Sequence, residues 1–173
     1  KALVDHFKEQ HSIAVLGRSE SRLAKEFPGL SCYSWESLSL DLVANYDVII
    51  NLAGENIGQR RWSEKQKRRI IDSRVKTTST LATMCSQLAD ASPRLINASA
   101  IGVYGLSNHH FDEDSVIPQQ PTDFLSEVAT QWEQALEPAI KAEVPVTILR
   151  FGVVLAKQGG ALAKLLPSFK FGL

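Results

Sequence analysis

Hydrophobic residues along the chain follow two patterns, short β-branched runs and longer stretches at helical spacing. The clearest short run is Val48-Ile49-Ile50, which leads into Asn51-Leu52-Ala53-Gly54. It is too short for a helix and apolar on both faces, as in a central parallel strand that helices cover on both sides. Similar runs predict strands at residues 12–16, 31–34, 47–52, 94–99 and 146–149.

Stretches with helical spacing separate these strands. The longest covers residues 63–89 and has Ser63 in the position of an N-cap. Further helical stretches are predicted at residues 1–10, 21–27, 38–44, from 124 onward and at 162–169. Because strands and helices alternate, the pattern predicts an α/β fold with a doubly wound parallel sheet and right-handed crossovers.

The turn after residue 50 is the first candidate binding site. Ligands of open α/β sheets bind beyond the carboxyl ends of the strands, and small residues there allow close approach to the backbone. Asn51–Gly54 is therefore expected to form the floor of such a site, with an ordinary strand-to-helix turn as the alternative reading. The chain opens in a helical pattern, so we expect the first strand and its glycine-rich turn to be missing from it.

Composition and charge narrow the class of protein. The 173 residues suffice for one domain with its own core. Nineteen basic residues balance nineteen acidic ones, so no net field favours nucleic acid or a membrane as partner. The densest basic run, Lys65 to Arg69, is predicted to be a solvated helix face. Cys32 and Cys85 lack metal-ligand spacing, which favours two buried cytoplasmic thiols over a disulfide.

Several motifs occur together in one order along the chain. They are Gly17-Arg18-Ser19, Asn51-Leu-Ala-Gly-Glu-Asn-Ile57, Arg60-Arg-Trp62, Ser73-Arg-Val75, Ala98-Ser-Ala-Ile-Gly-Val-Tyr-Gly105, Phe124-Leu-Ser-Glu-Val128 with Trp132-Glu133, and Leu149-Arg-Phe-Gly-Val-Val-Leu155. In this combination the chain resembles the short-chain dehydrogenase/reductase superfamily, in its extended or atypical branch. More narrowly it resembles the "epimerase family" proteins described as nucleoside-diphosphate-sugar epimerases, including the cell-division-inhibitor-like ones.

The resemblance implies a domain organisation and a cofactor. Residues 1–157 would form a truncated NAD(P)-binding Rossmann domain, and residues 158–173 would begin a small substrate domain. At the end of the second strand, NAD enzymes place an acidic residue and NADP enzymes a cation that neutralises the 2′-phosphate. Here Arg18 and Ser19 occupy that place, which predicts NADP(H) rather than NAD(H). The other reading of Arg18 is a solvent-exposed turn residue.

Further cofactor contacts follow from the resemblance. Ala53 and Gly54 would pass under the ribose side of the dinucleotide. Glu55 would contact a ribose hydroxyl or cap the next helix, and both readings stay open. Ser99, at the end of the fifth strand of the family's sheet, and Gly152-Val153, after the sixth, would face the nicotinamide end.

The catalytic motif of the superfamily is absent. No Y-x-x-x-K occurs in the chain, and alignment on the motifs puts Leu125 and Ala129 where Tyr and Lys stand in the family. The family's hydroxyl residue on the fifth strand falls on Ala100, with Ser99 one residue earlier. Ser99 and Tyr104 are the catalytic candidates that remain for proton transfer. Whether the chain is catalytic is therefore left open.

Glu127 is a third candidate proton donor, with a helix-surface carboxylate as the alternative reading. The loop residues His109-His110 and Asp112–Asp114 are predicted to be a polar loop and not a metal site.

Three functional readings follow from the resemblance. The first is an NADP(H)-binding epimerase or reductase that acts on a small molecule such as a nucleotide sugar. The second is a non-catalytic NADP(H) sensor that acts through a protein partner, which the missing Tyr–Lys pair favours. The third is a doubly wound domain that no longer binds nucleotide.

Overall fold

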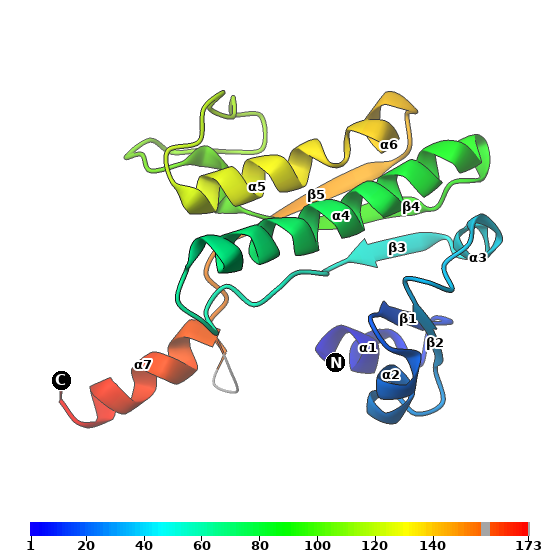
Figure 1. The fold of residues 1–173 in the computed structure, drawn as a ribbon, viewed down its shortest axis with the longest axis horizontal. Coiled ribbons are helices and arrows are strands. Elements are labelled where there is room, and N and C mark those ends of the chain that lie inside the picture. The colour runs from blue at the N-terminus through cyan, green and yellow to red at the C-terminus, as the bar shows by residue number, and fades with distance from the viewer. Residues whose placement is uncertain (157–159, 173) are drawn as a thin grey trace. The chain divides into compact units, whose positions relative to one another are not determined.

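The computed structural model describes residues 1–156 and 160–172. Helices and parallel strands alternate in it, and the chain forms two compact units, Lys1–Asn45 and Tyr46–Leu173 (Figure 1). Because both units contain parallel strands joined through helices, the predicted α/β architecture is confirmed. The predicted boundary between residues 157 and 158 lies within residues 157–159, which are outside the described residues.

The unit Lys1–Asn45 is built around two parallel strands. Its elements are, in order, α1 (Ala2–Phe7), β1 (Ala14–Gly17), α2 (Glu20–Glu26), β2 (Ser31–Ser34) and α3 (Leu40–Ala44). β1 pairs with β2 in the register Ala14↔Ser31. Ser19 caps the N-terminus of α2 by accepting a hydrogen bond from the backbone N–H of Arg22.

The unit Tyr46–Leu173 contains a parallel sheet in the order β3-β4-β5. Its elements are β3 (Val48–Asn51), α4 (Glu64–Leu88), η1 (Ala89–Ala91), β4 (Arg94–Ala100), η2 (Ile101–Tyr104), α5 (Phe124–Gln134), α6 (Glu137–Lys141), β5 (Val146–Phe151) and α7 (Gly160–Lys170). α4 runs alongside both α5 and α6, which follow one another along it (Figure 1). The pairing Ile49↔Leu95 and Asn97↔Ile148 aligns the carboxyl ends of the strands, from which the candidate site loops leave.

The strand pairings match parts of the strand order that is usual in doubly wound sheets. In the usual doubly wound sheet the strands follow the order 3-2-1-4-5-6. β1 and β2 correspond to strands 2 and 3 of that order, and β3, β4 and β5 correspond to strands 4, 5 and 6. Strand 1 has no counterpart among the described strands. The absence of a first strand from this chain was predicted from the sequence and stays a prediction.

Beyond shifts of one or two residues, element boundaries differ from the sequence patterns at two places. The first helix is shorter than the predicted 1–10 and ends at Phe7. The helix predicted from residue 124 onward stops at Gln134, and a separate short helix, α6, begins at Glu137. Pro138 explains the break, because proline lacks the N–H for a helical hydrogen bond and disfavours helical backbone just before it.

The burial predicted for β3 is wrong on one face. Val48 and Ile50 are 44% and 45% exposed, whereas Asn51 is buried. Alternate side chains of a strand point to opposite faces, and the face of Asn51 is the one that meets α4. Val48 and Ile50, on the other face, are therefore only partly covered. The β-branched run therefore predicted the strand correctly but not its surroundings.

A buried polar cluster joins four elements of this unit. Asn51 Nδ2 donates to Thr78 Oγ1 at 2.8 Å and to Asn97 Oδ1 at 2.6 Å. Trp132 Nε1 donates to the same Thr78 oxygen at 2.9 Å. Thr78 and Asn97 are fully buried, so this cluster fixes the ends of β3 and β4 against α4 and α5.

Replacing Thr78 by valine tests this cluster. The variant keeps the side-chain shape but leaves the indole N–H of Trp132 buried without an acceptor. Because such a loss costs about 1–3 kcal/mol per group, we expect the free energy of unfolding in urea to fall by about 2 kcal/mol.

Thr80→Val is the matched control, since Thr80 is exposed and its hydroxyl donates only to the Lys76 carbonyl of its own helix. It should change the free energy of unfolding by less than about 0.5 kcal/mol. Equal effects of the two substitutions would contradict a stabilising role for the cluster.

Candidate functional site

Arg18 follows directly on β1 and lies exposed at its carboxyl end. Among the described residues its side chain has no hydrogen-bond or ionic partner. Gly17 before it lets α2 pack closely, because a Cβ there would lie 3.1 Å from a methyl carbon of Leu23. Ser19 after it is used as the N-cap of α2. The guanidinium of Arg18 is thus free at the place predicted for the cofactor's 2′-phosphate.

Glu20 is the carboxylate nearest to Arg18 in the sequence, and it is engaged elsewhere. Its Oε1 accepts from the backbone N–H of Ser34, at 3.0 Å, and from the Ser37 hydroxyl. The hydroxyl of Ser37 and the N–H of Ser34 lower the pKa of Glu20. The carboxylate thereby joins the start of α2 to the end of β2 and leaves Arg18 unpaired.

Arg74, on α4, holds the loop that follows β3. Its Nη1 donates to the carbonyls of Glu55 and Ile70, both at 3.0 Å. Its guanidinium lies 5.0 Å from the ring centroid of Trp132. Burial lowers the pKa of Arg74, and the Glu55 carboxylate works against that shift. The sequence motif Ser73-Arg-Val75 contained this residue, but nothing in its spacing indicated the contact.

The small residues of this loop meet protein atoms in the structure. A Cβ on Gly54 would lie 2.9 Å from Cζ of Arg74, so glycine at this position lets the guanidinium in. The Ala53 N–H donates to Oδ1 of Asn51, and the Glu55 N–H to the Ser73 hydroxyl at 2.8 Å. The loop at the carboxyl end of β3 is therefore rigidly placed before any ligand binds.

One of the two readings of Glu55 is wrong. The next helix, α4, begins at Glu64 and is capped by the Ser63 side chain, which accepts from the Gln66 N–H. Glu55 lies well before this cap and forms no part of it. Ser63 as N-cap was predicted correctly from the sequence.

At the ends of β4 and β5, Glu133 and Arg150 form a two-point ion pair. Arg150 Nε and Nη2 each donate to a different Glu133 oxygen at 3.0 Å. Ser99 Oγ donates to Glu133 Oε1 at 2.6 Å, and Arg150 Nη1 donates to the Tyr104 hydroxyl at 2.8 Å. The hydrogen bonds that Arg150 donates to Glu133 raise the pKa of Arg150, with a smaller contribution from Tyr104. Ser99 and Tyr104 are thus brought to one network, as neighbours of the same pair.

The hydroxyl groups of both catalytic candidates, Ser99 and Tyr104, already donate hydrogen bonds within the protein. The Tyr104 hydroxyl donates to the Asp112 carbonyl at 2.8 Å, and its ring stacks on Phe111 at a centroid distance of 4.6 Å. Ser99 is only 3% exposed, with its proton on Glu133. These contacts anchor the long loop after η2 to the end of the sheet.

The family positions on α5 and after β5 carry no ionisable group. Leu125 is 39% exposed and Ala129 is buried at 1%. Gly152 has room for a Cβ, which would lie 3.8 Å from Ile101, and Val153 beside it is largely exposed. Gly152 and Val153 therefore lie at an open strand end and offer no side-chain proton donor.

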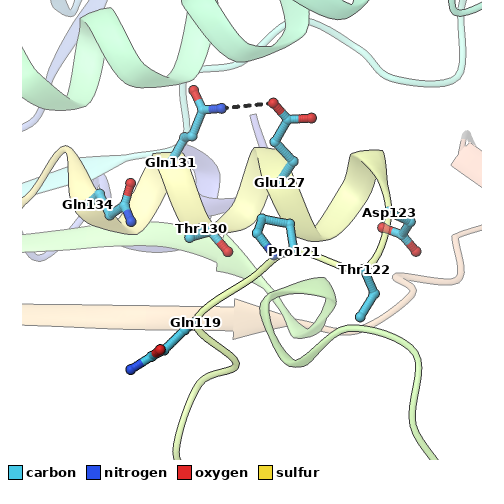
Figure 2. Close-up of a pocket in the computed structure, with 8 residues that line it drawn as sticks. All are labelled: Gln119, Pro121, Thr122, Asp123, Glu127, Thr130, Gln131 and Gln134. Atoms are coloured by element: carbon cyan, nitrogen blue, oxygen red, sulfur yellow. Dashed lines mark hydrogen bonds between the residues drawn. The ribbon is translucent and has the colours of Figure 1, made fainter.

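A shallow groove of about 510 Å³ runs along α5 (Figure 2). Its lining is polar and consists of Gln119, Pro121, Thr122, Asp123, Glu127, Thr130, Gln131 and Gln134. Figure 2 shows the hydrogen bond from Gln131 to Glu127, at 3.1 Å, which engages the third candidate proton donor. Asp123 caps α5 by accepting from the Ser126 N–H. The sequence pattern gave no signal for this groove.

Two further findings concern other ligand classes. Within residues 1–156 and 160–172, no three His, Cys, Asp or Glu side chains gather as metal ligands would. Over the same residues, no helix combines the length and apolarity needed to cross a membrane. Cys32 and Cys85 are both free thiols, and burial raises the pKa of Cys85.

Comparison with known protein sequences finds relatives that belong to one family. Residues 1–169 match the family model described as "NAD dependent epimerase/dehydratase family". The Arabidopsis thaliana "Epimerase family protein SDR39U1 homolog, chloroplastic" is 39% identical over 170 residues, covering 94% of this chain and 47% of the relative. The mouse epimerase family protein SDR39U1 is 36% identical over 157 residues, covering 89% and 53%. The chain thus spans about half the length of these curated relatives.

Solved structures agree with the predicted Rossmann fold. Human epimerase family protein SDR39U1 (isoform 2), solved with NADPH, aligns with a TM-score of 0.73 and 29% identity, covering 99% of this chain and 56% of that chain. A nucleoside-diphosphate sugar epimerase from Corynebacterium glutamicum aligns with a TM-score of 0.66 and 26% identity, covering 98% and 41%. The resemblance to the epimerase family seen in the sequence motifs is confirmed.

Breaking the Glu133–Arg150 pair on one side should cost more than replacing both partners. Their side chains are 9% and 20% exposed, so Glu133→Gln alone leaves a largely buried guanidinium without its counter-charge. We expect the free energy of unfolding in urea to fall by about 2–4 kcal/mol in that variant and in Arg150→Met, and by less than the sum in the double variant.

Glu137→Gln supplies the control, because the Glu137–Lys141 pair is exposed on both sides and should be worth less than about 1 kcal/mol. Strictly additive losses at Glu133 and Arg150 would show that the two charges do not act as a unit.

Proposed function

The chain belongs to the NAD dependent epimerase/dehydratase family, and from this premise we propose that it binds NADP(H) and acts as an NADP(H)-dependent epimerase or reductase. Its substrate in this proposal is a small molecule, with a nucleotide sugar as the first candidate. The chain spans about half the length of its curated relatives, and the activity is proposed for the whole protein.

The unpaired guanidinium of Arg18 is the observation that carries the cofactor assignment. It stands at the end of β1, where dinucleotide-binding sheets meet the adenosine ribose. The nearby carboxylate of Glu20, which could have accepted a ribose hydroxyl, is held by Ser34 and Ser37. A free guanidinium favours a 2′-phosphate, which it can bind with two parallel hydrogen bonds. The human relative solved with NADPH supports the same cofactor.

The other cofactor contacts are proposed at the carboxyl ends of β3, β4 and β5. Ala53, Gly54 and Glu55 lie on the loop that Arg74 holds in place, and the carboxylate of Glu55 is assigned to a ribose hydroxyl. Ser99 on β4, and Gly152-Val153 directly after β5, complete this set. A loop held before binding loses little conformational entropy when the cofactor arrives, which favours affinity.

Tyr104 is the proposed proton donor, since Ser99 is more deeply buried. A carbonyl that accepts a hydride from NADPH also needs a proton on its oxygen. In this structure the Tyr104 hydroxyl accepts from Arg150 and donates to the Asp112 carbonyl. To act as donor it has to exchange the Asp112 carbonyl for the substrate oxygen, while Arg150 keeps the phenol oxygen in position.

A non-catalytic NADP(H) sensor is the second candidate function. The observation that favours it is the use of both candidate protons inside the protein, by Glu133 and by the Asp112 carbonyl. Leu125 and Ala129, at the family's Tyr and Lys positions, add nothing that could replace them. In this reading, bound NADP(H) changes the long loop after η2, and a protein partner responds to that loop.

We also propose a cytoplasmic location and no nucleic-acid or membrane partner. The balanced charge and the two free thiols support this.

Arg18→Ala tests the cofactor assignment. Removing the guanidinium should weaken NADPH binding at least about tenfold, or about 1.4 kcal/mol, and leave NADH binding within about twofold, because only NADPH carries the 2′-phosphate. Calorimetric titration of both nucleotides measures the two changes.

Arg22→Ala is the matched control, since Arg22 is an exposed arginine of the same unit whose side chain forms no hydrogen bond or ion pair among the described residues. A loss of NADPH affinity that is the same in both variants would contradict a specific role for Arg18.

A measurement of hydride transfer distinguishes the enzyme hypothesis from the sensor hypothesis. NADPH oxidation is followed with a panel of nucleotide sugars and simple carbonyl compounds, on the unaltered protein and on Tyr104→Phe. The enzyme reading expects turnover that falls about a hundredfold or more in Tyr104→Phe. NADPH binding without turnover of any compound supports the sensor.

A further inference from the structure

Basic residues are concentrated at the start of α4. The ten residues from Arg60 to Arg69 include six Lys or Arg and one acid, Glu64. We call five of these cations the cationic cluster: Arg60, Arg61, Lys65, Arg68 and Arg69. The run Lys65–Arg69 was predicted from the sequence to be a solvated helix face.

The members of the cationic cluster are exposed and unpaired. Lys65, Arg68 and Arg69 are spaced three and four residues apart, so they share one face of α4, and Arg60 and Arg61 precede the helix. Among the described residues, none of the five side chains forms a hydrogen bond or an ion pair.

Other lysines of the same helix are neutralised locally. Lys67 pairs with Glu64 at 3.0 Å, and Lys76 pairs with Asp72 at 3.3 Å. The absence of local pairing is therefore particular to the cationic cluster and not a property of the whole helix. Unpaired like charges held this close repel one another, and an anion between them relieves the repulsion.

The cationic cluster lies on the ligand side of the sheet. It ends the connection that leaves the carboxyl end of β3, where ligands of α/β sheets bind. Trp62, inside this segment, donates its indole N–H to the Ile57 carbonyl at 2.8 Å and packs on Phe124 at a centroid distance of 5.1 Å. Phe124 opens α5 and precedes Leu125, the position of the family's catalytic tyrosine. The cationic cluster is thus tied to the substrate side of the proposed site.

A buried hydrogen-bond donor without an acceptor occurs in the same turn of α4. Gln66 is only 5% exposed, and within the described part of the chain its Nε2 has no hydrogen-bond acceptor. A buried polar group without a partner calls for an explanation, and an ion or ordered water next to it is a common one.

The charge around the cationic cluster favours a small anion over a large one. Residues 95–140 of the same unit contain seven acidic residues and no Lys or Arg. The unit therefore carries acidic residues as well as these cations, and its charge gives no extended positive surface for a nucleic acid or an anionic membrane. A single phosphate or diphosphate group can lie within the cationic cluster alone.

We propose that the cationic cluster binds a phosphate group of the protein's small-molecule ligand. That this ligand is the substrate rests on the proposed function, whereas phosphate binding at the cationic cluster does not. Arg60 and Arg61 approach the phosphate from the turn, and Lys65, Arg68 and Arg69 from the helix. Two or three of these cations suffice for one diphosphate, by charge-assisted hydrogen bonds.

Inorganic pyrophosphate is the probe, titrated by calorimetry into the full-length protein with NADPH present at saturation, so that the cofactor's own phosphate sites are filled. The double variant Arg68→Gln/Arg69→Gln should bind it at least about tenfold more weakly than the unaltered protein, and so should Arg60→Gln/Arg61→Gln. Binding should also weaken as salt is raised, because the contacts are ionic.

Lys76→Gln is the matched control, a lysine further along the same helix that is already paired with Asp72. It should leave pyrophosphate binding within about twofold. An equal loss in the control, no loss in the two double variants, or no binding by the unaltered protein would each overturn the proposal. So would binding to vesicles of anionic lipid in place of pyrophosphate.

NADPH affinity of the same variants is measured in parallel. It should be unchanged, which shows that the exposed substitutions leave the fold intact. If the unaltered protein binds pyrophosphate through the cationic cluster but does not bind NADPH, the proposed function fails and the phosphate site stands.

Discussion

The hydrogen-bonded cluster of Asn51, Thr78, Asn97 and Trp132 is the constraint on which the site in Tyr46–Leu173 depends. Polar side chains from two strands and two helices are buried there, and each can be buried only because the others satisfy it. Since Asn51 and Asn97 lie near the carboxyl ends of β3 and β4, the cluster fixes the points from which the candidate ligand loops leave. Asn51 also holds the first turn of its own loop through the Ala53 N–H.

Two arginines hold the loops that follow these strands in place. Arg74 binds the Glu55 carbonyl and fills the space that Gly54 leaves open, and Arg150 joins Glu133 to Tyr104. Both loops are placed before a ligand is present, which suits tight cofactor binding. The same contacts use the protons of Ser99 and Tyr104, so the feature that favours binding works against catalysis. This opposition is the physical reason for keeping an enzyme and a sensor as the two candidate functions.

Much of the fold and the family could be predicted from the sequence, because the strands at 47–52 and 94–99, the long helix after Ser63 and the ordered motifs are local signals. The exposed faces of Val48 and Ile50 could not be predicted, since a β-branched run does not say what packs on it. The contacts of Arg74 with Glu55 and of Glu133 with Arg150 join residues 17 to 19 positions apart, beyond any local pattern. The capping reading of Glu55 was wrong because Ser63, already expected as an N-cap from the sequence, caps α4. The roles of Ser99, Tyr104 and Arg18 stay predictions.

A diffraction structure of the full-length protein with NADPH is the most direct test of the central claim, which is NADP(H) binding through Arg18. We expect the 2′-phosphate within hydrogen-bond distance of the Arg18 guanidinium, with Glu20 still bound to Ser34 and Ser37. A 2′-phosphate bound by other residues, or a Glu20 carboxylate turned to the ribose with Arg18 in solvent, would contradict it.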